Sequence, residues 1–172
     1  CQYSSRYGKY LAGERTNTFD PSLSNAAIMD IGVYPLHCLV MLFGEPLSVS
    51  ANSVFLDNGF EASGEVTLAY EGFTASALYS KVYDSSRPSA IFGEEGVILI
   101  NRLSVPSEAI LIRRGEEPEK LSVRPVPNNM VWEIKDFAEL VGSGNVRHDF
   151  ADNTEAVMKI LDGARAAAGI RF

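Results

Sequence analysis

The chain has a central region in which apolar and polar residues alternate with a period of two, flanked by regions with helical spacing. The runs 66–70 and 73–79 alternate on either side of the dipeptide Glu71-Gly72. Alternation on both sides of a tight turn is typical of a β-hairpin. One face of this hairpin carries mainly small and polar side chains. The pattern therefore predicts a sheet that buries one face only.

Further short apolar runs indicate that the sheet region extends from residue 47 to residue 125. Residues 89–92 and 97–100 flank the turn sequence Gly93-Glu94-Glu95-Gly96, which predicts a second hairpin. Residues 109–112 and 121–124 are two more short strand candidates. We count about seven or eight strands, and we expect them to be mainly antiparallel because they follow one another directly in the sequence.

Two segments before the sheet region have less regular patterns. Residues 2–12 alternate well enough to predict a strand. Residues 26–43 are largely apolar and end at Gly44, where a helix-terminating glycine is expected. Pro35 interrupts this segment, and proline costs about 3 kcal/mol inside a helix. Either the helix is kinked there, or its regular part begins near Pro35.

Two helices are expected at the end of the chain. Residues 130–141 place four apolar side chains on one face: Val131, Ile134, Ala138 and Val141. The last helix is expected to open with the capping-box sequence Asp152-Asn153-Thr154-Glu155 and to end at Gly169. Its predicted buried stripe consists of Val157, Ile160, Leu161, Ala164 and Ala168.

These elements predict the α+β class, with one broad, mainly antiparallel sheet and helices packed on one face. The other face is expected to stay open, so that it either remains hydrated or pairs with a copy of itself in a homo-oligomer. The chain has 172 residues, of which 46% are hydrophobic. We therefore expect residues 1–172 to form a single domain.

Charge and composition exclude several classes of partner. The net charge of -7 argues against nucleic acid as a partner, because an acidic surface repels phosphates. No apolar run is long enough to cross a membrane. With two cysteines and no recognisable signal peptide, we expect a cytoplasmic protein. Because the chain starts with Cys1 inside a predicted strand, we also expect it to be a fragment of a longer protein.

Several chemistries lack their sequence signatures. The 14 glycines form neither a GxGxxG nor a GxxxxGK[ST] motif, so we expect no cofactor to bind this chain alone. No GxSxG motif for a hydrolase is present. His37 and His148 are the only imidazoles, and the adjacent Cys38 would diverge from His37 on a helix, which argues against a metal site.

The densest polar cluster on an apolar segment consists of Asp30, Tyr34 and His37. At positions i, i+4 and i+7 of a helix, a carboxylate, a phenol and an imidazole lie along one stripe. Such a trio suits proton transfer to or from a substrate oxygen. A phenol needs a neighbouring cation to work at neutral pH, and no obvious cation lies nearby in the sequence.

Structural roles are equally open for these residues. Asp30 can cap the helix, Tyr34 can be a core tyrosine, and His37 can be a packed, hydrogen-bonded histidine. If the helix starts at Pro35, Asp30 leaves the stripe. Among the arginines, Arg6, Arg113 and Arg114 can bind an anion, although solvated surface arginines are far commoner.

Three stretches resemble the glucose-fructose oxidoreductase/inositol dehydrogenase/MocA family. The first runs from Phe19-Asp20-Pro21 through Asn25 to His37 and ends at Phe43-Gly44-Glu45-Pro46. The second, residues 91–98, is similar to the family's sheet hairpin, and the third, residues 153–170, to its last helix. The matches occur in order along nearly the whole chain. At Asn25-Ala26-Ala27 this sequence departs from a glycine pair or triplet that is frequent in the family.

The resemblance implies a C-terminal substrate-binding and dimerisation domain whose N-terminal Rossmann partner, which binds NAD or NADP, is missing here. Tyr34 matches the family's general acid/base, and Asp30 matches a substrate-contacting acidic residue. We assign His37 to substrate binding as well. A lysine in a Glu-Lys-Pro motif of the missing domain would supply the cation.

The expected function is that of an NAD(P)-dependent oxidoreductase acting on a sugar, polyol or related hydroxy or carbonyl compound. The isolated chain is expected to be inactive. The alternative is a non-catalytic binding or oligomerisation module.

Overall fold

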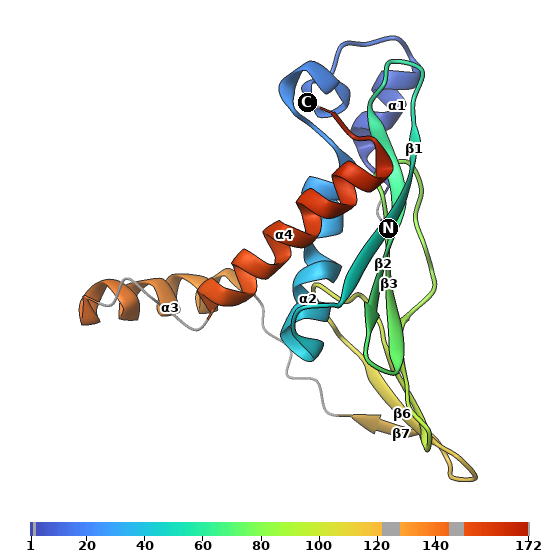
Figure 1. Ribbon diagram of the computed structural model, residues 1–172, viewed down its shortest axis with the longest axis vertical. Helices are drawn as coiled ribbons and strands as arrows, with labels where there is room; N and C mark the ends of the chain where they lie inside the picture. The colour runs from blue at the N-terminus through green and yellow to red at the C-terminus, as the bar shows by residue number, and fades with distance from the viewer. Residues whose placement is uncertain (2, 122–127, 145–149, 172) are drawn as a thin grey trace. The chain divides into compact units, whose positions relative to one another are not determined.

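The computed structural model describes residues 1, 3–121, 128–144 and 150–171 (Figure 1). The chain divides into two compact units. One unit comprises Cys1–Ser85 together with Asp149–Phe172, and the other comprises Ser86–His148. Whether residues 1–172 act as one domain stays a prediction. Among the helices of the described ranges, none has the length and apolar character that a membrane crossing requires.

The first unit combines a three-stranded sheet with helices from both ends of its sequence. Its sheet has the order β1-β2-β3, and both pairings are antiparallel. The predicted hairpin is confirmed: Tyr70 pairs with Phe73, and Gly72 adopts a φ of 84° in the turn. The elements are α1 (Ser5–Leu11), the 3-10 turns Asn17–Phe19 and Pro21–Leu23, a π-helical turn (Ile28–Gly32), α2 (Val33–Phe43), β1 (Ser48–Phe55), β2 (Glu61–Tyr70), β3 (Phe73–Ser80) and α4 (Phe150–Ala168).

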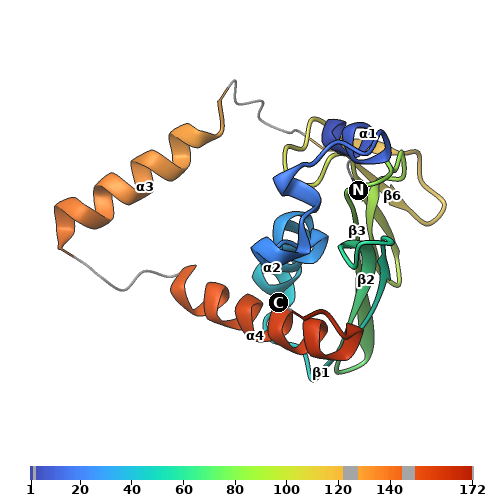
Figure 2. The same ribbon diagram turned by 90° about the horizontal axis from the view of Figure 1, so that it is seen from above.

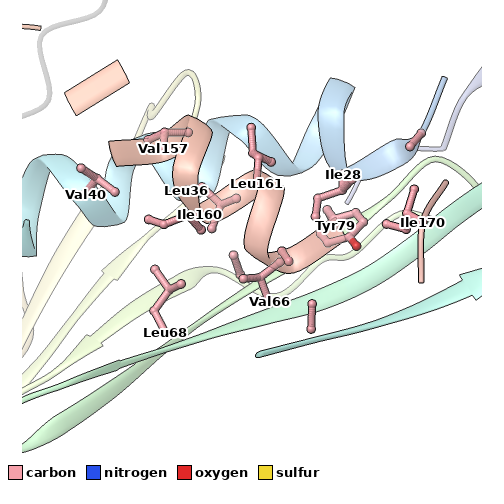
Figure 3. Packing of buried hydrophobic residues seen from close by; sticks show 14 of the residues in the cluster. Ile28, Leu36, Val40, Val66, Leu68, Tyr79, Val157, Ile160, Leu161 and Ile170 are labelled. Atoms are coloured by element: carbon pink, nitrogen blue, oxygen red, sulfur yellow. The ribbon is translucent and has the colours of Figure 1, made fainter. Parts of the chain in front are cut away.

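Helices α2 and α4 cover the same face of this sheet, as Figure 2 shows. Their apolar stripes meet the inward-facing residues of the strands (Figure 3). Each large side chain buried in this way contributes about 1.5–3 kcal/mol. The largest members of the core are Ile28, Leu36, Val66, Leu68, Tyr79, Val157 and Leu161.

An irregularity in β2 turns one acidic side chain toward the helices. Val54 pairs with Ser63, but Phe55 pairs with Glu61, so that Ala62 is an extra residue opposite β1. Such a bulge shifts the alternation of the side chains along the strand. Glu61 is consequently buried, with 1% of its surface exposed.

In its described residues, the second unit contains a four-stranded antiparallel sheet and one helix. The strands are β4 (Ser89–Phe92), β5 (Gly96–Ile100), β6 (Ala109–Arg113) and β7 (Glu119–Leu121), in the order β4-β5-β6-β7. The hairpin predicted around Gly93 and Gly96 is confirmed. Of the strand predicted for residues 121–124, Leu121 is the last residue of β7, and residues 122–124 lie outside the described residues. The predicted helix is confirmed as α3 (Met130–Ser143), but its apolar residues, Val131 and Ile134 among them, are exposed.

The α+β class is confirmed, while two details of the predicted architecture differ. Within the described residues, the seven strands hydrogen-bond as two sheets rather than as one broad sheet. The segment predicted as a strand at residues 2–12 is a helix, α1. Tyr3, Tyr7 and Tyr10 are spaced by four and three residues, and their rings lie against one another. Spacing of this kind places the three rings on one face of a helix, whereas in a strand Tyr7 and Tyr10 would point to opposite faces. The Ser4 hydroxyl caps the helix by accepting from the Arg6 N–H.

The predicted start of the last helix is wrong, whereas four of the five residues of its predicted buried stripe are buried and Ala168 is half-buried. Helix α4 includes Phe150, so Asp152 lies inside the helix instead of capping it. The Thr154 hydroxyl donates to the carbonyl of Phe150 at 2.9 Å, as threonine does within a helix. The stripe from Val157 to Ala164 is buried, and Gly169 ends the helix with a φ of 72°.

Candidate functional site

The segment that carries Asp30, Tyr34 and His37 is helical throughout. The π-helical turn Ile28–Gly32 leads directly into α2. Regular α-helix begins at Val33, two residues before Pro35, and the wider turn precedes the proline that cannot donate to the carbonyl of Ile31. Asp30 therefore stays within the helical segment, and all three candidates lie on one continuous stretch of helix.

Asp30 forms an ion pair with a lysine from the far end of β3. Its Oδ2 lies 2.6 Å from the Nζ of Lys81. The Asp30 side chain is 61% exposed, whereas that of Lys81 is only 5% exposed. A capping role for Asp30 is wrong, because no side chain caps the helix at this turn. Asp30 instead provides the counter-charge for a buried ammonium group.

Lys81 is held in place by both its backbone and its side chain. Its N–H donates to the carbonyl of Ala62 at 2.9 Å, and its carbonyl accepts from the N–H of Ser4 at 2.8 Å. The ammonium group lies 5.6 Å from the centre of the Phe60 ring. Burying an unpaired ammonium group costs several kcal/mol, so the pairing with Asp30 stabilises this arrangement. Lys81 is therefore a buried cation beside Asp30.

Sequence reasoning missed Lys81 because its pairing with Asp30 depends on tertiary structure. The one available signal was weak: a lysine that follows directly on the alternating strand 73–80. Lysines at strand ends are most often solvated, and nothing in the pattern distinguishes this one.

Tyr34 is exposed, with 59% of its surface accessible. The alternative that Tyr34 is a core tyrosine is therefore wrong. No hydrogen bond to its hydroxyl is found within the described residues, so the phenol can contact a ligand. Its catalytic role stays a prediction.

His37 lies half-buried on α2. Within the described part of the chain it has no hydrogen bond or ion pair, so the structure does not support a hydrogen-bonded packing role. Its assignment to substrate binding stays a prediction, and His148 lies outside the described residues. In the described ranges, no cluster of three or more His, Cys, Asp or Glu side chains could hold a metal ion.

A polar pocket of about 460 Å³ opens beside Asp30 and Lys81. It lies entirely within the first unit. Its walls come from α1, the first 3-10 turn, residues 24–26, the start of the helical segment and Lys81 after β3. The polar residues that contribute to it, besides the ion pair, include Arg6, Asn17, Thr18 and Asn25. Hydroxyl, amide and charged groups of this kind can bind a polyhydroxy compound.

The three arginine candidates differ in their surroundings. Arg6 lines the pocket and donates to the hydroxyl of Thr18 at 2.7 Å. Arg113, in the second unit, is paired with Glu119 at 2.8 Å and with Glu116 at 3.4 Å. Arg114 donates to the carbonyl of Glu94 at 3.0 Å. Among the described residues neither Arg6 nor Arg114 has a carboxylate partner, and Arg6 is the one of the three that lines the pocket beside Asp30.

Glu61 is a buried carboxyl group at the start of the site helix. Its Oε2 accepts from the N–H of Ile28 at 3.0 Å. Burial raises the pKa of Glu61, while the Ile28 N–H and the hydroxyls of Tyr79 and Ser53 act in the opposite direction. Burial also raises the pKa of Tyr79, whose hydroxyl lies 3.0 Å from that of Ser53. Sequence reasoning missed Glu61, because the bulge that turns it inward has no signature in the pattern.

The sequence of this chain is similar to those of curated oxidoreductases. The chain is 41% identical over 172 residues to the uncharacterized oxidoreductase YgjR of Escherichia coli (strain K12), covering 100% of this chain and 52% of that protein. It is 35% identical over 174 residues to the scyllo-inositol 2-dehydrogenase (NADP(+)) IolU of Bacillus subtilis (strain 168), covering 100% of this chain and 53% of that protein. The chain thus spans about half the length of the curated relatives it matches.

The fold and a family model point the same way. The crystal structure of KijD10, a 3-ketoreductase from Actinomadura kijaniata in complex with NADP, matches with a TM-score of 0.74 at 22% identity, over 83% of this chain and 48% of that one. At this level of identity the likeness concerns the fold. The model of the GFO/IDH/MocA C-terminal domain matches residues 1–99, more than half of the 172-residue chain. The chain therefore belongs to the GFO/IDH/MocA oxidoreductase family and carries its C-terminal domain.

Proposed function

We propose that this chain is the substrate-binding half of an NAD(P)-dependent oxidoreductase that acts on a sugar, polyol or related hydroxy compound. The observation that carries the proposal is the 2.6 Å ion pair between Asp30 and the buried Lys81. Asp30 lies on the same helical segment as the exposed Tyr34. Family membership and the NADP-dependent relative that acts on an inositol support the reaction type and the substrate class.

The nucleotide would be held mainly by residues outside this chain. The 172 residues contain no glycine fingerprint for a dinucleotide, and the chain covers about half of its curated relatives. The exposure of Asp30 and Tyr34 fits this division, because both side chains can meet a substrate presented from another domain. The bound nicotinamide supplies or accepts the hydride.

The residues of this chain would bind the substrate and move a proton. Tyr34 would donate a proton from its hydroxyl to the substrate oxygen during reduction, and would accept it during oxidation. Asp30 would accept a hydrogen bond from a neighbouring substrate hydroxyl. Lys81 is a positioning residue, because its ammonium group holds the Asp30 carboxylate at the pocket. His37 would contact the substrate one turn further along α2.

The test is the Tyr34→Phe substitution in the full-length protein, assayed by absorbance at 340 nm with NADP⁺ and scyllo-inositol. Loss of a general acid/base lowers turnover by about 100-fold or more, and we expect a decrease of that size. Tyr70→Phe is the matched control, because Tyr70 donates its hydroxyl to the carbonyl of Gly44 at the opposite end of α2. Equal turnover in both variants would remove Tyr34 from the mechanism. Absence of turnover in the parent with scyllo-inositol, myo-inositol, D-glucose, D-glucuronate and D-glucose 6-phosphate alike would contradict the substrate class.

We also propose that the open face of the first unit's sheet joins two copies of the protein. This face carries small polar side chains, such as Thr67 and Ser76, together with the exposed Val54 and Leu78. A face of this kind can pair with itself across a two-fold axis. Light scattering on the parent and on Leu78→Lys tests the proposal, because a monomeric parent would contradict it.

A further inference from the structure

The pocket beside the Asp30–Lys81 pair has a charge balance opposite to that of the chain. Among the described residues that line it, Arg6 and Lys81 are cations and Asp30 is the single acid. Lys81 and Asp30 neutralise each other at 2.6 Å. Arg6 therefore leaves the lining with a net positive charge, whereas the whole chain carries -7. A positively charged hollow on an acidic protein attracts anions in preference to cations.

Arg6 retains most of its hydrogen-bonding capacity. Its Nη1 donates to the Thr18 hydroxyl at 2.7 Å, a neutral partner that orients the guanidinium without neutralising it. A guanidinium has five N–H donors, so several remain for a ligand. Asp20, the acid between the two 3-10 turns, is engaged by Arg15 at 3.6 Å and by the Ser22 hydroxyl at 2.6 Å. Within the described residues, Arg6 has no carboxylate partner.

The element that carries Arg6 is fixed by aromatic packing. Tyr7 and Tyr10, on the same short helix, each lie 5.6 Å from the ring of Phe19. Phe19 in turn packs against Phe60 at 4.9 Å, beneath the Lys81 ammonium group. Arg6, Thr18 and Lys81 are thus placed around the pocket by one cluster of rings, so little ordering is needed when a ligand binds.

We propose that Arg6 forms an anion subsite in this pocket, and that the substrate carries a carboxylate or phosphate group which this guanidinium binds. Arginine suits both groups, because its planar fork pairs with two oxygens at once. The inference rests on the proposed function: the anionic end of the substrate lies at Arg6, and its reacting hydroxyl lies toward Asp30 and Tyr34. The substrate class narrows from sugars and polyols to their acidic or phosphorylated derivatives.

The test is the binding of inorganic phosphate to the full-length protein saturated with NADP⁺, followed by line broadening in ³¹P NMR. Saturation with the nucleotide occupies the other expected phosphate site. We expect saturable binding by the parent and at least a tenfold weaker affinity in Arg6→Gln. Arg15→Gln is the matched control, because Arg15 is 87% exposed and pairs with Asp20 away from the pocket lining. No saturable binding by the parent, or equal affinity in Arg6→Gln, would overturn the subsite.

Two further measurements separate the sources of the anion and the two proposals. Acetate that displaces phosphate at equal concentration indicates a carboxylate ligand, whereas a tenfold preference for phosphate indicates a phosphorylated one. Turnover of scyllo-inositol, D-glucuronate and D-glucose 6-phosphate by the parent is measured on the same samples. Turnover without Arg6-dependent phosphate binding overturns the anion subsite alone. Arg6-dependent phosphate binding without turnover of any of these compounds, neutral, carboxylated or phosphorylated, overturns the proposed reaction alone.

Discussion

The ammonium group of Lys81, almost fully buried at the end of β3, lies 2.6 Å from the exposed carboxylate of Asp30 on the helical segment that precedes the sheet. The two residues depend on each other unequally. Lys81 has lost its hydration and relies on Asp30 for a counter-charge, whereas Asp30 is still in contact with water. The pair therefore connects the stability of the fold to the position of a candidate substrate-binding group.

Because the buried Lys81 depends on Asp30 for its counter-charge, substitution of the exposed Asp30 should destabilise the fold. We expect Asp30→Asn to lower the free energy of unfolding by about 1–2 kcal/mol, less than for a fully buried pair because Asp30 is exposed. Urea unfolding of the full-length protein measures the change. Asp57→Asn, an exposed aspartate in the turn before β2, is the control and should change little. When Asp30→Asn is introduced into the Lys81→Met variant, it should lower the free energy of unfolding little, because no buried charge is left without its partner. A cost that persists there would show that the ion pair is not its cause.

The elements predicted best are those whose pattern has only one structural solution. The hairpin around Glu71-Gly72 and the buried stripe of α4 were both predictable, because local spacing and turn chemistry agree there. The first helix was not, because the alternation in residues 2–12 indicates a strand, although the spacing of the three tyrosines by four and three residues is helical. The division of the strands into two sheets was also not predictable. It depends on which strands hydrogen-bond to one another, and the positions of the strands in the sequence do not determine this.

The candidate site was predictable only in part, for a similar reason. Asp30, Tyr34 and His37 are close in sequence, and helical spacing relates them directly. Lys81 and Glu61 reach the same helix from the sheet, through the end of one strand and a bulge in another. Neither feature leaves a periodic signal, so both residues required the tertiary structure.

The buried carboxyl group of Glu61 predicts a specific dependence of stability on pH. Burial raises its pKa in the folded protein above the value of about 4.3 of an exposed glutamate. Between the unfolded and folded pKa values the native state holds more protons, so its stability decreases as the pH rises through this interval. The stabilisation is complete below the unfolded pKa and is lost above the folded one.

The Glu61→Gln substitution should remove this dependence. Its carbonyl can still accept from the Ile28 N–H, and no charge is buried at neutral pH. We expect the free energy of unfolding of Glu61→Gln, relative to the parent, to increase from pH 4 to pH 7 by about 1.4 kcal/mol for each unit that separates the two pKa values. Glu65→Gln, at an exposed position of the same strand, controls for general charge effects. A constant difference across this pH range would contradict the assignment.

Two glycines with opposite surroundings predict opposite effects of the same substitution. A Cβ on Gly64 would overlap the Tyr79 phenol oxygen and the Asn52 carbonyl, both of which belong to neighbouring strands. Gly163 lies inside α4, where the nearest atom to an added Cβ is the Cβ of Val49 at 4.0 Å. We expect Gly64→Ala to destabilise the protein by about 1–3 kcal/mol, because a packed core has no space for the methyl group.

Gly163→Ala should instead stabilise the protein by up to about 1 kcal/mol, the difference in helix propensity between the two residues. Thermal unfolding of the two variants beside the parent measures both effects with the same added methyl group.

Because Tyr79 crosses over Gly64 to reach the Ser53 hydroxyl, Gly64→Ala should also disturb the environment of Glu61. Combining Gly64→Ala with Glu61→Gln therefore tests whether the two sites are coupled. If the change in the free energy of unfolding of the double variant equals the sum of the two single changes, Gly64 and Glu61 are independent. A smaller combined loss would show that the two residues are coupled.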